Sequence, residues 1–139
     1  MHDHFIKRLN PPELPDSSTY GFSQITVVPP GVKLVHIAGQ YGADTNDNLI
    51  SEDFAEQLKQ SFNNLRNALA AVGASPEQVV KITILSVDHT MEKLKLISAA
   101  RNAMWSRDRQ PASTLIPVSR LAVDGMLFEI DAVAVIPSV

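Results

Sequence analysis

Large apolar residues recur at helical spacing through the middle of the chain. The pattern over residues 51–73 predicts a long amphipathic helix with one face laid on a sheet. Ser51 is the candidate N-cap of this helix, and Gly73 is its candidate C-cap. The residues that define the apolar face are Phe54, Leu58, Phe62, Leu65, Leu69 and Val72.

A second helix is predicted to begin after Thr90, whose side chain can cap it, and to end near residues 106–109. The helical pattern assigns Met91, Leu94, Ile97 and Met104 to its inward face, and Lys93, Lys95 and Arg101 to its outward face.

Alternating apolar and polar residues predict strands before, between and after the helices. The expected strands are 5–8, 21–28, 33–38, 79–87, 113–119 and 126–136. The turn signals at residues 29–31 and 124–125 predict a hairpin at each place. The resulting order is β-β-β-α-β-α-β-β, which indicates an α+β fold in which two helices share one face of a mixed sheet. A chain of 139 residues fits a single domain spanning residues 1–139.

The last strand is apolar on both of its faces. Its one face carries Phe128 and Ile130, and its other face carries Leu127 and Val133 beside Glu129. Two helices can cover only one face, and the chain offers no further element for the other. We therefore expect another subunit to cover it.

Composition and charge remove several classes of function. The net charge of −3 and the pI near 5.7 disfavour nucleic-acid binding, which depends on basic residues. The absence of cysteine excludes disulfides, thiolate metal sites and Cys nucleophiles. We expect no metal and no cofactor. No apolar run reaches 18 residues and no signal-peptide pattern is seen at the start, so we expect no membrane association and a cytoplasmic location.

Glu129 is the first candidate for chemistry. It lies in mid-strand among apolar neighbours, where desolvation raises the pKa of a carboxyl group. Such a group can orient a water molecule or move a proton near neutral pH. The alternative is a carboxylate that is exposed at a sheet edge or held by a nearby lysine or arginine.

Histidines give weaker signals. His2 and His4 are interpreted as incidental, His36 as a core or interface residue, and His89 as exposed.

A group of four arginines could bind a carboxylate in bidentate fashion. These are Arg101, Arg107, Arg109 and Arg120. For Arg107 and Arg109 the alternative interpretation is a solvated helix end, whereas the role of Arg120, which follows a strand, stays open.

Several segments, taken in order, resemble the RidA/YjgF/YER057c/UK114 family. They are residues 22–24, 38–40, Gln57, 64–65, 72–75, 79–83, 111–112 and 128–134. The resemblance implies a chorismate-mutase-like α+β fold and a homotrimer with clefts between its subunits. It also implies hydrolysis of reactive enamines and imines to 2-oxo acids and ammonia without a cofactor.

The resemblance assigns site residues by position. The water-positioning glutamate of the family matches Glu129, and its Gly-Gln pair matches Gly39 and Gln40. Ala38 stands at the family's serine, and Phe22 at its aromatic residue. The other assigned positions are Ser98, at an asparagine, and Ser113, at the arginine that grips the substrate carboxylate.

Serine at position 113 removes the expected carboxylate clamp. A charge-assisted pair contributes about 1.5–3 kcal/mol, so its loss weakens binding of an amino-acid-derived imine about tenfold to a hundredfold. Three possibilities stay open: another cation replaces it, with Arg120 first; the substrate lacks a carboxylate there; or the cleft binds a ligand without turnover. We expect a small-molecule hydrolase of the deaminase type, with weak or absent 2-iminobutanoate/2-iminopropanoate deaminase activity. A metabolite-binding or regulatory trimer is the alternative, and an endoribonuclease ranks last.

Overall fold

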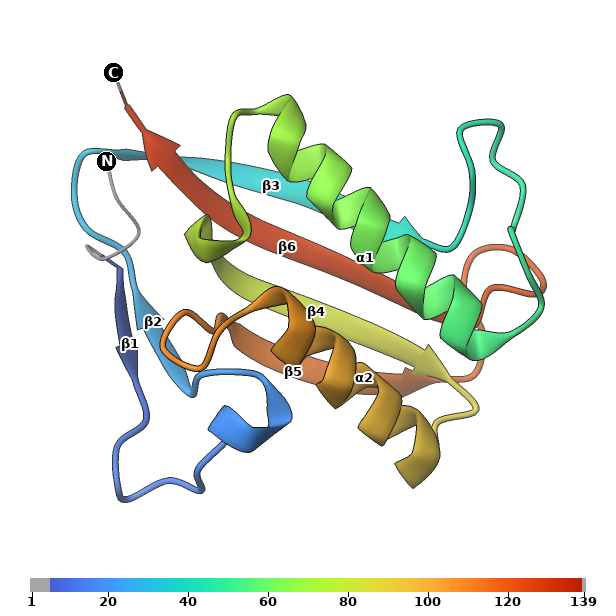
Figure 1. Ribbon diagram of the computed structural model, residues 1–139, viewed down its shortest axis with the longest axis horizontal. Coiled ribbons are helices and arrows are strands. Elements are labelled where there is room, and N and C mark those ends of the chain that lie inside the picture. The colour runs from blue at the N-terminus through green and yellow to red at the C-terminus, as the bar shows by residue number, and fades with distance from the viewer. Residues whose placement is uncertain (1–5, 139) are drawn as a thin grey trace.

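The structure of the protein is a computed structural model, and it describes residues 6–138. The elements follow the predicted order β-β-β-α-β-α-β-β, with two short 3₁₀ turns added (Figure 1). Their bounds are β1 (Lys7–Leu9), η2 (Ser18–Tyr20), β2 (Ile25–Val27), β3 (Val32–Tyr41), α1 (Phe54–Ala71), η3 (Pro76–Gln78), β4 (Val79–Val87), α2 (Met91–Met104), β5 (Ala112–Val118) and β6 (Phe128–Pro137).

A four-stranded mixed sheet forms the centre of the molecule, in the order β3-β6-β4-β5. β4 and β5 run parallel, whereas β6 is antiparallel to both of its neighbours. α1 and α2 lie across the same face of this sheet (Figure 1). Their apolar sides close the core against the sheet, where Leu65, Ile82 and Ile130 are fully buried. The α+β class predicted from the sequence is therefore correct.

Helix capping agrees with the sequence in part. Thr90 caps α2 as predicted, because its hydroxyl accepts a 3.1 Å hydrogen bond from the Lys93 amide. The N-cap of α1 is Asp53 rather than Ser51, and its carboxylate accepts a hydrogen bond from the Glu56 amide. α1 ends at Ala71, and the left-handed residue that follows its cap is Gly73, with a φ of +72°.

Both predicted hairpins are wrong. β2 pairs with β1 in a separate two-stranded sheet, and β3 pairs with β6 at the opposite end of the chain. β5 pairs in parallel with β4, so the turn at residues 124–125 leads from the sheet edge to an inner position. The second hairpin fails because α2 carries the chain back to the end of the sheet where β4 begins. β5 therefore runs parallel to β4, as a crossover connection requires.

Within residues 6–138, the sheet face opposite the helices is covered only at one end. Ile6 packs there with Val80 and Val135, so the expectation that no part of the chain reaches this face was wrong at that end. Elsewhere the face keeps exposed apolar side chains: Leu34 is 56% exposed and Ile116 is 43% exposed. The described residues of a single chain therefore leave much of this face without a partner.

Gln57 ties the loop before α1 and the segment that leads into β6 to helix α1. Its Nε2 donates 2.9 Å hydrogen bonds to the carbonyls of Ser51 and Gly125, and its Oε1 accepts one from the Leu127 amide. The side chain is fully buried. Gln57→Leu should lower the free energy of unfolding by about 3 kcal/mol, because it leaves buried backbone groups unpaired. Urea unfolding measures this loss, and Gln60→Leu, at a half-buried position on the same helix, is the control with a much smaller expected effect.

Candidate functional site

Glu129 lies on β6, on the face opposite the helices. It stands between Leu85 on β4 and Tyr41 on β3 in the strand register, and its side chain is half-buried. Its carboxylate packs directly over the backbone of Gly39, at the bulge that interrupts the β3–β6 ladder. The sequence analysis placed Glu129 and Gly39 in one site, and the fold brings these two residues together.

The pKa of Glu129 is raised above its ordinary value. The main cause is burial among apolar neighbours, and the negative charge of Asp131 adds to it. Asp131 is exposed and accepts a hydrogen bond from the Thr83 amide at 3.1 Å. None of the salt bridges found among the described residues involves Glu129. A carboxylate in this condition can accept a proton from a bound water molecule and return it later.

Gly39 is required at its position for a steric reason. A Cβ atom at residue 39 would lie only 2.1 Å from Glu129 Oε2 and 2.6 Å from its Cδ. We expect Gly39→Ala to displace the carboxylate and to reduce any Glu129-dependent activity at least tenfold, with a small change in melting temperature. Parallel activity and thermal unfolding measurements test this, and full activity in the alanine variant would contradict it.

A second cluster forms around Arg101 on α2. Its Nη1 donates a 3.1 Å hydrogen bond to Ser113 Oγ, and its guanidinium lies 5.0 Å from the centre of the Phe22 ring. Arg101 is only 2% exposed, so the prediction that it points outward was wrong. Ser98 lies one turn earlier on the same helix. Three of the predicted site positions thus gather around an arginine that was named among the possible carboxylate binders but was not assigned to the site.

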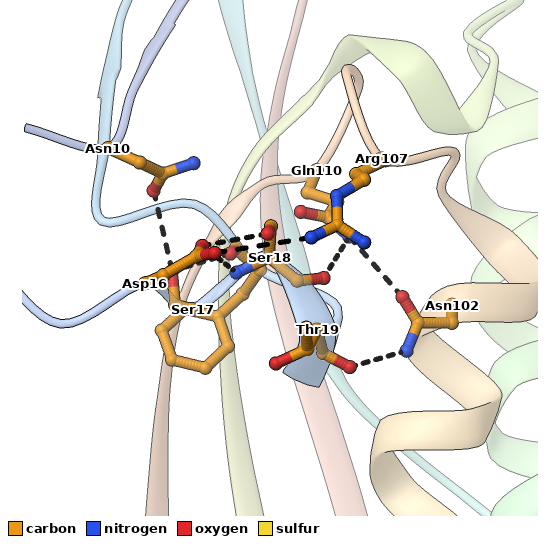
Figure 2. Close-up of polar contacts among 9 residues, drawn as sticks. Asn10, Asp16, Ser17, Ser18, Thr19, Asn102, Arg107 and Gln110 are labelled. Carbon is orange, nitrogen blue, oxygen red and sulfur yellow. Dashed lines mark hydrogen bonds and ion pairs between the residues drawn. The ribbon is translucent and has the colours of Figure 1, made fainter.

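The segment that carries Phe22 is held against α2 by a network of polar contacts (Figure 2). Asn102 Nδ2 donates to the Thr19 carbonyl at 3.0 Å, and Gln110 Nε2 donates to the Ser18 carbonyl at 2.9 Å. Gly21 then brings the backbone so close to Arg101 that a Cβ atom there would lie 2.5 Å from the Arg101 Cβ. The network therefore fixes the ring of Phe22 beside the guanidinium.

The remaining candidate residues lie elsewhere. Arg120 pairs with Asp124 at 2.8 Å and does not lie against Ser113 in the way that Arg101 does. Ala38 is exposed on β3, and the side chain of Gln40 donates to the Ala38 carbonyl at 3.0 Å.

The other predicted basic residues lie at the surface. Arg107 lies 4.0 Å from Asp16, and Arg109 contacts Asp108. His36 is exposed, so the core interpretation is wrong and the interface interpretation stays a prediction. His89 is half-buried, with its Nδ1 3.0 Å from Ser86 Oγ. His2 and His4 lie outside the described residues.

The sheet separates the two clusters within one chain. Ser113 pairs with Ile82 and faces the helices, whereas Glu129 pairs with Leu85 and faces the other way. They also lie on strands that are separated by β4. A single chain therefore does not unite Glu129 with Arg101 around one small ligand.

Two hollows occur near these elements. A polar one of about 270 Å³ includes Gly39 and Gln40 in its lining. A larger groove of about 660 Å³ lies between α1 and α2 and contains none of the predicted site residues. Within residues 6–138 we find no cluster of three or more potential metal ligands, and no helix that is long and apolar enough to cross a membrane.

Comparison with known proteins identifies the family. The family model described as Endoribonuclease L-PSP matches residues 16–136. The RutC family protein YjgH of Escherichia coli is 31% identical over 104 residues, which is 75% of this chain and 76% of that protein. This chain belongs to the RidA/YjgF family. Among other Rid relatives, the 2-iminobutanoate/2-iminopropanoate deaminase of Salmonella typhimurium is 28% identical over 104 residues, covering 73% of this chain and 79% of the enzyme.

Solved structures agree with this Rid fold. The Rid-family protein YyfB of Yersinia pestis, whose function is unknown, aligns with a TM-score of 0.89 and 30% identity over 95% of this chain and 99% of its own. The fold and family inferred from the sequence are thus confirmed. A deaminase-like role is supported at the level of the Rid family.

Proposed function

We propose that this Rid protein hydrolyses a small imine or enamine, with Glu129 positioning the attacking water. The observation that carries the proposal is the half-buried carboxylate of Glu129, which packs on the Gly39 backbone and has a raised pKa. Relatives named as 2-iminobutanoate/2-iminopropanoate deaminases support the class of reaction.

The chemistry needs one group that alternates between base and acid. Glu129 accepts a proton from water as the water oxygen bonds to the imine carbon, and the C=N π electrons pass to nitrogen. The protonated carboxyl group then returns the proton to that nitrogen. The C–N bond then breaks as the hydroxyl proton passes, through the same carboxylate, to the nitrogen, so that ammonia leaves and a carbonyl group forms. An enamine first gains a proton on carbon and loses one from nitrogen, which converts it to the imine.

We further propose that the working unit is a homotrimer assembled through the sheet face opposite the helices. That face carries Glu129 and the exposed Leu34 and Ile116. Apolar side chains of this kind favour association because their burial removes them from water. Association would enclose Glu129 in a cleft between subunits and lower its access to bulk water.

A second candidate function is binding of a small ligand without turnover. It is favoured by Ala38, which offers no hydroxyl on the exposed part of β3. Ribonuclease activity, which the family model's description names, is not proposed, because a net charge of −3 does not favour a polyanion.

The test is an assay on a 2-imino acid that an amino acid oxidase generates in the same solution. We expect the protein to accelerate the release of ammonia and 2-oxo acid. Thermal stabilisation by the imine's 2-oxo acid product with no acceleration of hydrolysis would favour the binding function instead.

A further inference from the structure

Arg101 is a buried cation that has no anionic partner among the described residues. Its side chain is 2% exposed, and burial lowers its pKa to about 10. Within residues 6–138, Arg101 forms no salt bridge, and its one hydrogen bond goes to the neutral hydroxyl of Ser113. A desolvated guanidinium is costly unless a charged partner compensates it. The fold keeps this charge without using it for any ion pair.

The polar atoms around Arg101 are also incompletely satisfied. Arg101 Nε and Ser98 Oγ are both buried, and neither has a hydrogen-bond partner in the part of the chain that the structure describes. The two residues are three apart on α2, so they share one face of the helix. Unpaired buried donors of this kind are rare in folded proteins and call for a partner.

The cluster lies just below the surface at the edge of the sheet. β5 is an edge strand, and its bridge to the N-terminal segment, between Ser23 and Ala112, ends where Ser113 begins. Phe22 and Ser113, which flank the guanidinium, are both only half-buried. The guanidinium is therefore flanked by two side chains that solvent reaches in part.

We propose that Arg101 binds the carboxylate of a small 2-oxo or 2-imino acid, assisted by the hydroxyls of Ser98 and Ser113. The guanidinium that binds the carboxylate then comes from helix α2, whereas the family resemblance places it on strand β5, at residue 113. The assignment of this anion to the ligand of the reaction rests on the proposed function. It also revises the expectation, drawn from Ser113 alone, that carboxylate-bearing imines are poor substrates.

The position of Arg101 requires two chains for a complete site. The sheet separates it from Glu129 within one chain, so the two groups can hold one ligand only across a subunit interface. One subunit would supply the guanidinium and its neighbour the carboxylate that moves the proton.

Calorimetric titration with pyruvate, with neutral pyruvamide for comparison, tests the binding step. Arg101→Met should weaken pyruvate binding about tenfold to a hundredfold, and Arg101→Lys should recover part of it. Lys95→Met removes an exposed cation from the same helix and should leave pyruvate affinity unchanged. Pyruvate affinity that is equal in wild type and Arg101→Met, or absent in wild type, would overturn the proposal.

Thermal unfolding separates binding from a structural role. Removal of an uncompensated buried charge should leave the melting temperature of ligand-free Arg101→Met unchanged or higher. Loss of pyruvate affinity accompanied by a large drop in melting temperature, with no recovery in Arg101→Lys, would mean that Arg101 is structural.

Glu129→Gln separates this proposal from the proposed function. It should retain pyruvate binding, because the guanidinium is intact. If the wild type binds pyruvate through Arg101 but hydrolyses no imine, the proposed function fails and the anion site stands. If imine hydrolysis depends on Glu129 but its KM is unchanged in Arg101→Met, the proposed function stands and the anion site fails.

Mixed trimers test whether the site is shared between subunits. Trimers assembled from equal amounts of Glu129→Gln and Arg101→Met chains should recover about a quarter of wild-type activity, because that fraction of the interfaces joins an intact Arg101 to an intact Glu129. No recovery would contradict a shared site.

Discussion

Glu129→Gln should reduce imine hydrolysis by about 10²–10⁴-fold, the usual contribution of a general base. The amide keeps the size and hydrogen-bonding capacity of the side chain but cannot take a proton from water. The fold should persist, because the carboxylate forms no salt bridge with the described residues. Steady-state kinetics measure the effect, and circular dichroism checks the fold.

Asp131→Asn is the matched control, since Asp131 lies two residues away on the same strand and is exposed. It should retain most of the activity but change its pH profile. A base must be deprotonated to act, so activity falls as the pH drops through the raised pKa of Glu129. Because the Asp131 charge contributes to that rise, its removal should move this acidic limb to lower pH. Undiminished hydrolysis by Glu129→Gln would exclude Glu129 from the mechanism.

Leu34→Glu should convert the proposed trimer into monomers. Leu34 is 56% exposed on the face opposite the helices, where association would bury it. Burial of a leucine contributes about 1.5–3 kcal/mol per copy, and a carboxylate in its place adds a desolvation cost. Sedimentation velocity should show the trimer-to-monomer change at micromolar concentration, and hydrolysis should fall with it because the cleft is no longer closed.

Met91→Glu is the control for this substitution. Met91 is 69% exposed at the first position of α2, on the helix-covered side of the molecule. A carboxylate suits a helix N-terminus, so neither assembly nor stability should suffer. A wild-type protein that sediments as a monomer, or a Leu34→Glu variant that stays trimeric, would refute assembly through this face.

The sequence predicted the elements of this Rid protein well wherever a local pattern governs them. The strand at residues 79–87 and the helix after Thr90 agree with β4 and α2. Apolar periodicity predicts which side of an element is buried, and this pattern depends only on residues within that element. The order of elements then restricted the fold to one class.

Local patterns did not predict which distant strands pair. The residues at 29–31 and 124–125 are good turn formers, yet neither turn joins paired strands. Turn chemistry fixes a local change of direction, whereas strand partners are chosen by the burial of whole faces. β6 is apolar on both sides and takes an inner place, which separates β3 from β4.

By itself, then, the chain of residues determined the fold class and the family and singled out Glu129 as a candidate, because periodicity, residue order and an acid among apolar neighbours are all local properties. Only the tertiary structure decided that Arg101 lies against Ser113. Helical spacing assigned this arginine to the outward face, since a charged side chain normally seeks water. The N-terminal segment with Phe22 covers that part of α2, and contacts between residues so distant in the chain form only in the folded protein.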